Sequence, residues 1–261
     1  MIAVPRSKRR KKDGPVAAPD PAALSHPDVD RLADGTLDDV HAVLGPHAID
    51  GGWVVRTFVP GAESADYIGV DGKNVAMHPI HPAGVFAVLL GEEPDGYRIT
   101  AKRGDAQWEY EDPYRFAAAV ERLHERLNSE ALNERVWKAL GAHPVSLQGI
   151  DGTLFGVWAP NAKRVSVVGD FNQWDGRRHV MRRRGSSGEW EIFLPGIGAD
   201  TAYMYEIVGA DGAMLPLKAD PVAFGATLRP DTRSVVRSID DHQWADAEWL
   251  TKRAERQRID R

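Results

Sequence analysis

The sequence predicts an all-β fold in which two β-sandwiches are joined by a helical connector and followed by a C-terminal helical segment. Two regions, 53–112 and 140–239, contain short runs in which apolar and polar residues alternate, separated by turns that contain glycine. Short strands at this spacing, without long helices between them, are typical of sandwiches. Landmarks of the first region recur in the same order in the second region, which indicates an internal duplication.

The chain divides into five predicted segments. They are a disordered basic tail (1–27), a first β-sandwich (28–114), a helical connector (115–139), a second β-sandwich (140–239) and a terminal linker helix (240–261). The tail contains the basic run Arg6–Lys12, for which a solvated tail is a simpler interpretation than binding to nucleic acid or anionic lipid. Apolar residues between 28 and 44 favour a short amphipathic helix ahead of the first strands.

Length and composition bound the class of the protein. The 261 residues have room for one large domain or two small ones, and 43% hydrophobic and 27% charged residues are ordinary for a globular chain. The net charge of −5 argues against nucleic acid or an acidic membrane as a partner. No apolar run reaches the ~20 residues that cross a bilayer. The chain has no cysteine, which excludes disulfides and cysteine-bound metal and fits the cytoplasmic location that we expect.

Two segments outside the sandwiches have helical periodicity. In 115–139, apolar residues recur at helical spacing on both sides of Asn128–Ser129, so we expect two helical pieces rather than one. The terminal segment carries Trp244 and Trp249 in an otherwise polar helical pattern. We expect these two tryptophans to contact another surface, because large exposed apolar side chains usually mark an interaction site.

Three pairs of short motifs carry the internal repeat. Leu44–His47 corresponds to Leu140–His143, Phe58–Pro60 to Trp158–Pro160, and Glu111–Pro113 to Ala219–Pro221. The first copy has no counterpart of the loop Gly169–Trp174, because Val70–Gly72 stands at that place. A ligand site in this loop would therefore belong to the second copy alone.

The stretch 152–175 combines two predicted strands with an aromatic loop. Alternating residues on both sides of Pro160–Asn161 favour a hairpin. The following loop places Phe171 and Trp174 beside Asn172 and two aspartates. An aromatic plate among amide and carboxylate groups suits a sugar, which has an apolar face and a rim of hydroxyls. The alternative interpretation is that the two aromatic side chains only plug the end of the sandwich.

No motif in the chain indicates catalytic chemistry. The sequence has no phosphate-binding glycine loop, no dinucleotide fingerprint and no nucleophile elbow. No two carboxylates can be identified as an acid/base pair. His78 and His81 have a spacing found in metal sites, but proline follows each of them and no third ligand is evident. We therefore expect polar loop histidines, with no metal and no cofactor.

The order of motifs resembles the N-terminal half of bacterial glycogen branching enzymes. The resemblance rests on Leu140–Pro144, Phe155–His179, Lys218–Pro221 and Leu228–Pro230, and it extends from about Leu44 to the C-terminus. It implies an immunoglobulin-like, early-set sandwich for each region. The second would be a carbohydrate-binding module of family 48, and the first would be the extra N-terminal module that longer branching enzymes carry.

The same resemblance implies a role in glycogen biosynthesis. Members of the family cleave an α-1,4 glucan bond and transfer the released chain to a 6-hydroxyl, using an aspartate nucleophile and a glutamate acid/base in a (β/α)8 barrel. That barrel would begin just after Arg261 and needs about 250 residues. We therefore assign no catalytic residue and expect this chain to be inactive alone. The expected partners are α-glucan and the catalytic barrel, with Trp244 and Trp249 facing the barrel.

The glucan-binding residues of the family carry over only in part. In related glycogen-binding modules a loop tryptophan stacks on glucose, supported by a lysine and a second tryptophan. Trp174 matches the loop tryptophan, with Phe171 and Asn172 beside it, whereas Met204 and Met214 stand at the other two places. Two other interpretations stay open, namely a free-standing glycogen-binding or regulatory module and a sandwich that binds a protein partner through its terminal helix.

Overall fold

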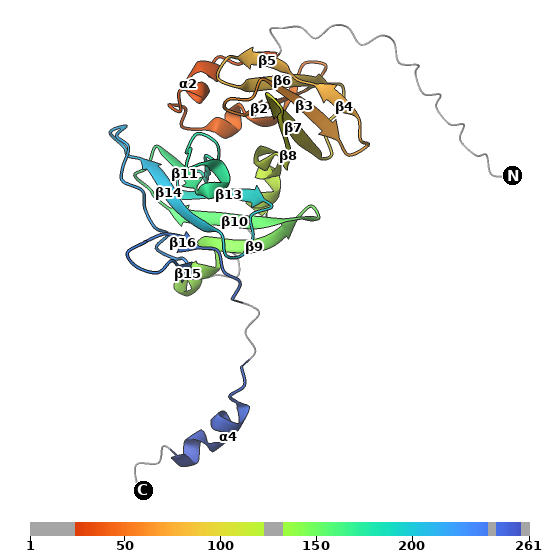
Figure 1. The fold of residues 1–261 in the computed structure, drawn as a ribbon. Coiled ribbons are helices and arrows are strands. Elements are labelled where there is room, and N and C mark those ends of the chain that lie inside the picture. Colours follow the sequence, from red (N-terminus) through yellow and green to blue (C-terminus); the bar gives the residue numbers. More distant parts are fainter. Residues whose placement is uncertain (1–23, 123–132, 240–243, 257–261) are drawn as a thin grey trace, which may run out of the picture.

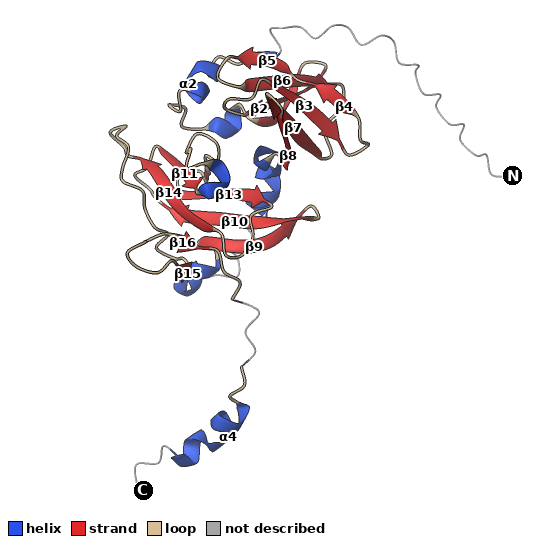
Figure 2. Ribbon diagram, viewed as in Figure 1, coloured by secondary structure: helices blue, strands red, loops and turns tan. Residues whose placement is uncertain are grey.

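The computed structural model describes residues 24–122, 133–239 and 244–256. As predicted, two β-sandwiches follow one another along the chain, and each consists of two four-stranded sheets (Figures 1 and 2). We call residues 24–116 the first module and residues 139–239 the second module. Most of the predicted tail and the expected break at Asn128–Ser129 lie outside the described residues.

The first module pairs a sheet of order β1-β2-β6-β5 with a sheet of order β4-β3-β7-β8, and all its strand pairs are antiparallel. Its strands are β1 (Gly45–Ile49), β2 (Gly52–Phe58), β3 (Ser64–Gly69), β4 (Asn74–Ala76), β5 (His78–His81), β6 (Val85–Leu90), β7 (Tyr97–Arg103) and β8 (Ala106–Glu111). Val55, Phe86 and Ile99 are almost fully buried between the two sheets. Val54 and Ala87, the neighbours of Val55 and Phe86 along their strands, belong to a separate buried cluster with Leu24, so β2 and β6 are buried on both faces.

His78 and His81 lie in strand β5 rather than in the loop expected from the prolines that follow them. The strand is short, and its pairing with β6 shifts register between Pro79 and His81. Proline is tolerated here because β5 is an edge strand, where a missing N–H leaves no ladder bond unmade.

The expected helix over 28–44 is two short pieces instead, α2 (Val29–Ala33) and the 3₁₀ turn η1 (Val40–Ala42). The chain turns between them at Gly35, whose φ of 72° is left-handed. A Cβ at Gly35 would lie 2.9 Å from side-chain atoms of both Arg164 and Arg177. The break therefore depends on glycine twice, for its backbone conformation and for close approach to the second module.

The second module pairs a sheet of order β12-β13-β10-β9 with a sheet of order β11-β14-β16-β15. Its strands are β9 (Gly141–Leu147), β10 (Ile150–Trp158), β11 (Arg164–Val168), β12 (Arg182–Arg183), β13 (Glu189–Pro195), β14 (Ala202–Val208), β15 (Gly225–Ala226) and β16 (Ser234–Val235). Phe155, Trp190 and Tyr203 are buried in the core between these sheets.

The predicted hairpin within 152–175 is wrong. Strand β10 pairs with β9 and β13, whereas β11 pairs with β14 in the other sheet. The turn at Pro160–Asn161 therefore carries the chain across the sandwich. Alternation tells which face a side chain occupies, but it does not tell which strand is the neighbour.

The connector packs against the second module where it begins. After η2 (Pro113–Phe116) the chain is helical to residue 122, and it re-enters the described part at η3 (Asn133–Lys138). Phe116 and Val120 form a buried cluster with Leu154 and Phe193, on the outer face of the sheet that contains β10 and β13. This cluster explains why Leu154, which points away from Phe155 on the same strand, is also buried.

The two modules share one buried cluster. It contains Leu32, Leu37, Val40, Phe58 and Tyr114 of the first module together with Phe155, Val165, Val180, Met181 and Trp190 of the second. A continuous apolar core of this kind resists independent motion of the modules, because separating them would expose it to water. Beyond the second module, helix α4 (Ala247–Arg256) carries Trp249, which is 46% exposed.

Candidate functional site

The aromatic loop follows β11 and begins with the 3₁₀ turn η4 (Asp170–Asn172). Gln173 and Trp174 come next with φ values of 59° and 61°, so two consecutive non-glycine residues are left-handed. Such residues cost about 1–3 kcal/mol each and persist only where the surroundings hold them. The carbonyl of Gly169 accepts hydrogen bonds from the backbone N–H of Asn172 (3.2 Å) and of Trp174 (3.0 Å). The loop therefore closes on its own first residue.

The side chain of Asn172 holds this loop in place through three hydrogen bonds. Its side chain is fully buried. Its Oδ1 accepts from the backbone N–H of Gly169 (3.0 Å), and its Nδ2 donates to Val167 O (2.9 Å) and to His179 Nδ1 (3.1 Å). Burial lowers the pKa of His179 to about 3, so the ring is neutral and its Nδ1 is free to accept. With all these groups used inside the protein, Asn172 positions the loop rather than meeting solvent.

Phe171 is partly buried and packs against the core that the modules share. Its ring stacks on His179 with 5.6 Å between the ring centroids. The ring also lies against Gly169, where a Cβ would meet it at 2.5 Å. Phe171 therefore closes the end of the second sandwich, as the plug interpretation predicts.

Trp174 is partly exposed, like Phe171, but it is not among the side chains packed against the shared core. Its indole N–H donates to Asp170 Oδ1 over 2.8 Å, and the guanidinium of Arg233 lies 5.9 Å from its ring centroid. Arg233 also lies 3.8 Å from Asp170 and forms a closer ion pair, of 2.6 Å, with Asp231. The hydrogen bond from Arg233 lowers the pKa of Asp231. Trp174 is thus held at its edge by Asp170 and flanked by a fixed cation.

The sequence predicts carboxylates beside Trp174 but neither the specific bond to Asp170 nor the contact with Arg233. Asp170 precedes Trp174 by four residues, and a one-turn loop brings residues at that spacing together, so its role could have been found. Arg233 comes from the segment just before β16, and no local pattern connects it with the loop. Met214, which stands where the resemblance leads us to expect a second tryptophan, is 55% exposed.

The segment that follows Trp174, as far as Val180, contacts the first module. Tyr114 donates its hydroxyl to Arg178 O (3.0 Å) and accepts from the backbone N–H of Val180 (3.2 Å). His41 Nε2 donates to Val180 O over 3.2 Å. The segment that descends from Trp174 is therefore held by side chains more than sixty residues earlier in the chain.

Two arginines extend this contact between the modules. Arg177 binds Asp175 through its Nη2 (2.8 Å) and donates from Nη1 to Ala33 O (3.3 Å). Burial works to raise the pKa of Asp175, but the hydrogen bonds from Arg177 outweigh it and the pKa is lowered. Arg164 binds Gly35 O and Glu206, and its side chain is only 5% exposed. Both guanidinium groups thus stabilise the turn at Gly35 against the base of the loop.

The terminal tryptophans lie apart from this site. Trp244 is 78% exposed and Trp249 is 46% exposed, with the 51% exposed Leu250 beside it. Within the described residues, no group of three or more His, Cys, Asp or Glu side chains is arranged to hold a metal ion. None of the described helices is long and apolar enough to cross a membrane.

Comparisons with known proteins divide the chain as the structure does. Residues 25–114 match the family model of the alpha-1,4-glucan branching enzyme GlgB N-terminal domain. Residues 139–223 match the model of carbohydrate-binding module 48, also described as the isoamylase N-terminal domain. The two matched segments correspond to the first and second modules.

Curated relatives match most of the chain. The 1,4-alpha-glucan branching enzyme GlgB of Roseobacter denitrificans is 45% identical over 91% of this chain and 33% of its own length. The enzyme of the same name from Paramagnetospirillum magneticum is 48% identical over 90% of this chain and 31% of its own length. The chain therefore spans about a third of the length of the relatives that it matches, and it corresponds to their N-terminal region.

Proposed function

Since the chain belongs to the N-terminal region of the GlgB branching enzymes, with their N-terminal domain followed by a family 48 carbohydrate-binding module, we propose that it binds and positions α-glucan chains. The proposal assigns no catalytic step to the two modules. In a longer protein of this family, the reaction would be transfer of an α-1,4 glucan chain to a 6-hydroxyl by a separate barrel. We place this function in glycogen biosynthesis in the cytoplasm.

The observation that supports glucan binding is the fixed, partly exposed indole of Trp174. Its left-handed backbone, its bond to Asp170 and the flanking Arg233 restrict the ring before any ligand arrives. Pre-organisation of this kind improves affinity because less motion is lost on binding. Phe171 and Asn172 contribute by holding the loop in place rather than by touching the sugar.

One stacked ring gives only weak binding. A single aromatic contact contributes on the order of 1 kcal/mol beyond the buried area, whereas a millimolar complex needs about 4 kcal/mol. Glycogen presents many chain ends on one particle, so several weak contacts can act together. We therefore expect retention on the polymer but weak affinity for a short oligosaccharide.

Affinity electrophoresis in gels that contain glycogen tests this function. The chain should migrate more slowly as glycogen increases, and Trp174→Ala should restore the mobility seen without glycogen. Trp158→Ala is the matched control, because Trp158 is also on the second module and is 60% exposed but lies on strand β10. Equal mobility of the unaltered protein with and without glycogen would refute the proposal.

For the terminal helix we propose a docking role toward a catalytic barrel. The supporting observation is that Trp244, Trp249 and Leu250 are exposed together in the terminal segment. Exposed apolar side chains of this size favour association. We expect the isolated chain to self-associate at high concentration in sedimentation velocity, and the double variant Trp244→Ser/Trp249→Ser to remain monomeric. A monomeric unaltered chain at the same concentration would count against this role.

A further inference from the structure

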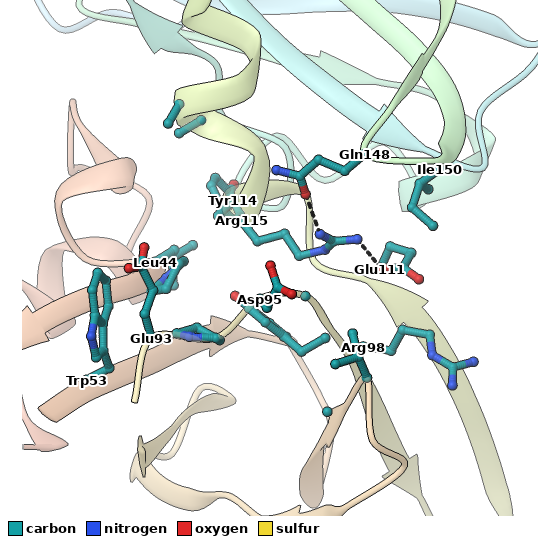
Figure 3. Close-up of a pocket in the computed structure, with 18 of the residues that line it drawn as sticks. Leu44, Trp53, Glu93, Asp95, Arg98, Glu111, Tyr114, Arg115, Gln148 and Ile150 are labelled. Carbon is teal, nitrogen blue, oxygen red and sulfur yellow. Dashed lines mark hydrogen bonds and ion pairs between the residues drawn. The ribbon is translucent and has the colours of Figure 1, made fainter. Parts of the chain in front are cut away.

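A cavity of about 980 Å³ lies where the first module meets the connector and the β9–β10 turn. Its wall includes Trp53 near the start of β2, the turn after β3, residues 93–96, Arg115 and Gln148 (Figure 3). Its size is within the range of sites that bind small molecules, and such sites are common at junctions between domains. The cavity lies apart from the loop that carries Trp174, none of whose residues lines it.

The difference between the two modules explains why this cavity is open. In the second module, Phe171 closes the end of the sandwich against Gly169. In the first module the short turn after Gly69 carries no such ring, and Val70 is 76% exposed. Trp53 occupies the place that Thr153 takes in the second module, counting back from the paired Phe58 and Trp158. The end of the first sandwich is therefore open and has an indole at its wall.

The polar groups of the wall favour a ligand that donates hydrogen bonds. Arg115 is paired with Glu111 and Gln148 over 2.8 Å each, and its side chain is 8% exposed. Arg98 is paired with Glu109. By contrast, Glu93 and Asp95 have no hydrogen-bond or ion-pair partner among the described residues, and the close-up shows both between Trp53 and Arg115 (Figure 3). Two free carboxylates face the opening.

The unpaired charges of the cavity wall disfavour a phosphate ligand. Of the guanidinium groups in the wall, Arg122 alone has no carboxylate partner among the described residues, so two unpaired carboxylates outnumber one unpaired cation. The histidines add no charge near neutral pH, because burial lowers the pKa of His41 to about 4 and also lowers the pKa of His47. An anion would meet net repulsion in this cavity. A neutral polyhydroxyl compound would meet an aromatic face and two strong acceptors.

From these observations we propose that the junction cavity is a second carbohydrate site, which binds a short α-glucan segment through Trp53, Glu93 and Asp95. The assignment rests on the proposed function, because it takes the same class of ligand. It gives the first module a binding role of its own. The two sites would hold separate glucan chains, or separate parts of one branched chain.

Tryptophan indole signals in NMR can separate the two sites. The chain has 8 tryptophans, and the Trp53 and Trp174 indole N–H signals are assigned from Trp53→Phe and Trp174→Ala. On titration of the ¹⁵N-labelled chain with maltoheptaose, the Trp53 signal should shift saturably, and it should do so equally in Trp174→Ala. A Trp174 shift without a Trp53 shift would overturn the second site and leave the proposed function standing. Loss of the Trp53 shift in Trp174→Ala would also overturn it.

Two further measurements test the ligand chemistry. The variant Glu93→Gln/Asp95→Asn should weaken maltoheptaose binding at Trp53 about fivefold, because charge-assisted acceptors are replaced by neutral ones. Glu92→Gln is the matched control, since Glu92 is exposed on the same loop but does not line the cavity. Unchanged affinity in the double variant would contradict the proposal. Inorganic phosphate should not shift the Trp53 indole signal. A saturable shift with phosphate would contradict the proposed carbohydrate site as well.

Discussion

The two modules share a frame of matching hydrogen bonds. In the first module, the carboxylate of Asp112 accepts a hydrogen bond from the Tyr97 hydroxyl over 2.5 Å. In the second module, Asp220 accepts the corresponding bond from Tyr203 over 2.7 Å. Each aspartate also accepts from the backbone N–H two residues later, at 3.0 and 2.8 Å. The aspartate thus joins a core strand to the segment that leaves the sandwich. The Asp-Pro motifs of the repeat mark this bond.

The same match holds at the other repeated motifs. His47 Nε2 donates to Leu44 O over 3.1 Å, and His143 Nε2 donates to Leu140 O over 2.9 Å. The turns after β2 and β10 close with N–H to carbonyl bonds of 2.8 Å, from residue 59 to 84 and from residue 159 to 188. The short Leu-Gly-x-His and Pro turns therefore satisfy backbone groups in the same way in both sandwiches.

The modules differ at the segment after β3 and β11. In both modules the segment ends in a methionine N–H that bonds back across the sheet, Met77 to Ala65 O (2.9 Å) and Met181 to Val165 O (2.8 Å). The chain needs 12 residues for this step in the first module (77 − 65) and 16 in the second (181 − 165). Four additional residues thus convert a tight turn into the loop that carries Trp174. A small insertion in a fixed frame is enough to create a candidate site.

The largest expected effect comes from breaking the shared frame. Asp220→Ala should destabilise the chain by about 3–4 kcal/mol, because it leaves the buried hydroxyls of Tyr203 and Tyr205 without their acceptor. Asp112→Ala should cost about 2–3 kcal/mol, since one tyrosine loses its acceptor. Thermal unfolding followed by circular dichroism measures both changes.

Asp151→Ala is the control for these two variants, because Asp151 is exposed at the start of β10 and should change stability by less than about 0.5 kcal/mol. If Asp112→Ala and Asp220→Ala melt at the same temperature as Asp151→Ala, the aspartates do not hold the two frames as described.

A smaller effect should follow from loosening the contact between the modules. Tyr114→Phe leaves Arg178 O and the N–H of Val180 without the tyrosine hydroxyl, and we expect a loss of about 2 kcal/mol. The Val180 amide should then exchange its hydrogen faster. Tyr110→Phe is the matched control, because its hydroxyl bonds to Thr57 within the first module. Faster exchange at Val180 in both variants would contradict a local role for Tyr114.

The contact between the modules should also weaken as the pH falls. Burial lowers the pKa of His41 to about 4 and that of His179 to about 3, from an ordinary value of 6.5. Below pH 6.5 the unfolded chain binds protons that the folded chain does not, so stability is lost from pH 6.5 downward. The melting temperature should therefore fall between pH 7 and pH 5.

Asp112 acts in the opposite direction, because burial raises its pKa to about 6. Its folded form holds a proton that the unfolded chain releases above pH 3.8, so its contribution is present at low pH and lost as the pH rises to 6. The double variant His41→Gln/His179→Asn keeps a donor to Val180 O and an acceptor for Asn172 without titrating. Its melting temperature should fall less toward low pH, with a remainder from His47, whose pKa is also lowered by burial. An unchanged pH profile would count against the assignment to His41 and His179.

The smallest effects concern the backbone of the two turns. Gln173→Gly should stabilise the chain by about 0.5 kcal/mol, because glycine adopts the left-handed conformation without strain. Gly72→Ala, in the shorter turn, should cost about 1 kcal/mol for the converse reason, although no atom lies within 4 Å of the added Cβ. Chemical denaturation resolves differences of this size, and effects of the same sign in both variants would contradict the comparison.

Much of the fold could be predicted because each sandwich strand has one face in the core. Strands β2, β3, β6 and β7 lie in the first of the two regions that the sequence predicts to form a sandwich. Strands β1, β4 and β5 escaped prediction because they are short or lie at sheet edges, where fewer side chains need to be apolar. Partners such as β11 and β14 could not be predicted either, since pairing is decided by contacts far apart in the sequence.

The candidate site was predictable only where its residues are neighbours in the chain. Trp174 and Phe171 follow from composition, but the burial of Asn172 does not, because the same side chain could have faced solvent. Arg233 and Tyr114 reach the loop from distant segments. The junction cavity was not predictable, since it depends on the absence of a ring in the first module and on the position of the second.

The buried cluster shared by the modules bears on how this protein can be divided. The sequence boundary near residue 139 is not a boundary of the cooperative folding unit, because Leu32, Val40 and Tyr114 complete a core that otherwise belongs to the second module. A fragment that starts at residue 139 would expose that core. It would also lack the hydrogen bonds from His41 and Tyr114 to Val180, which hold the segment after Trp174. Truncation at the apparent linker would therefore remove part of the scaffold on which Trp174 depends.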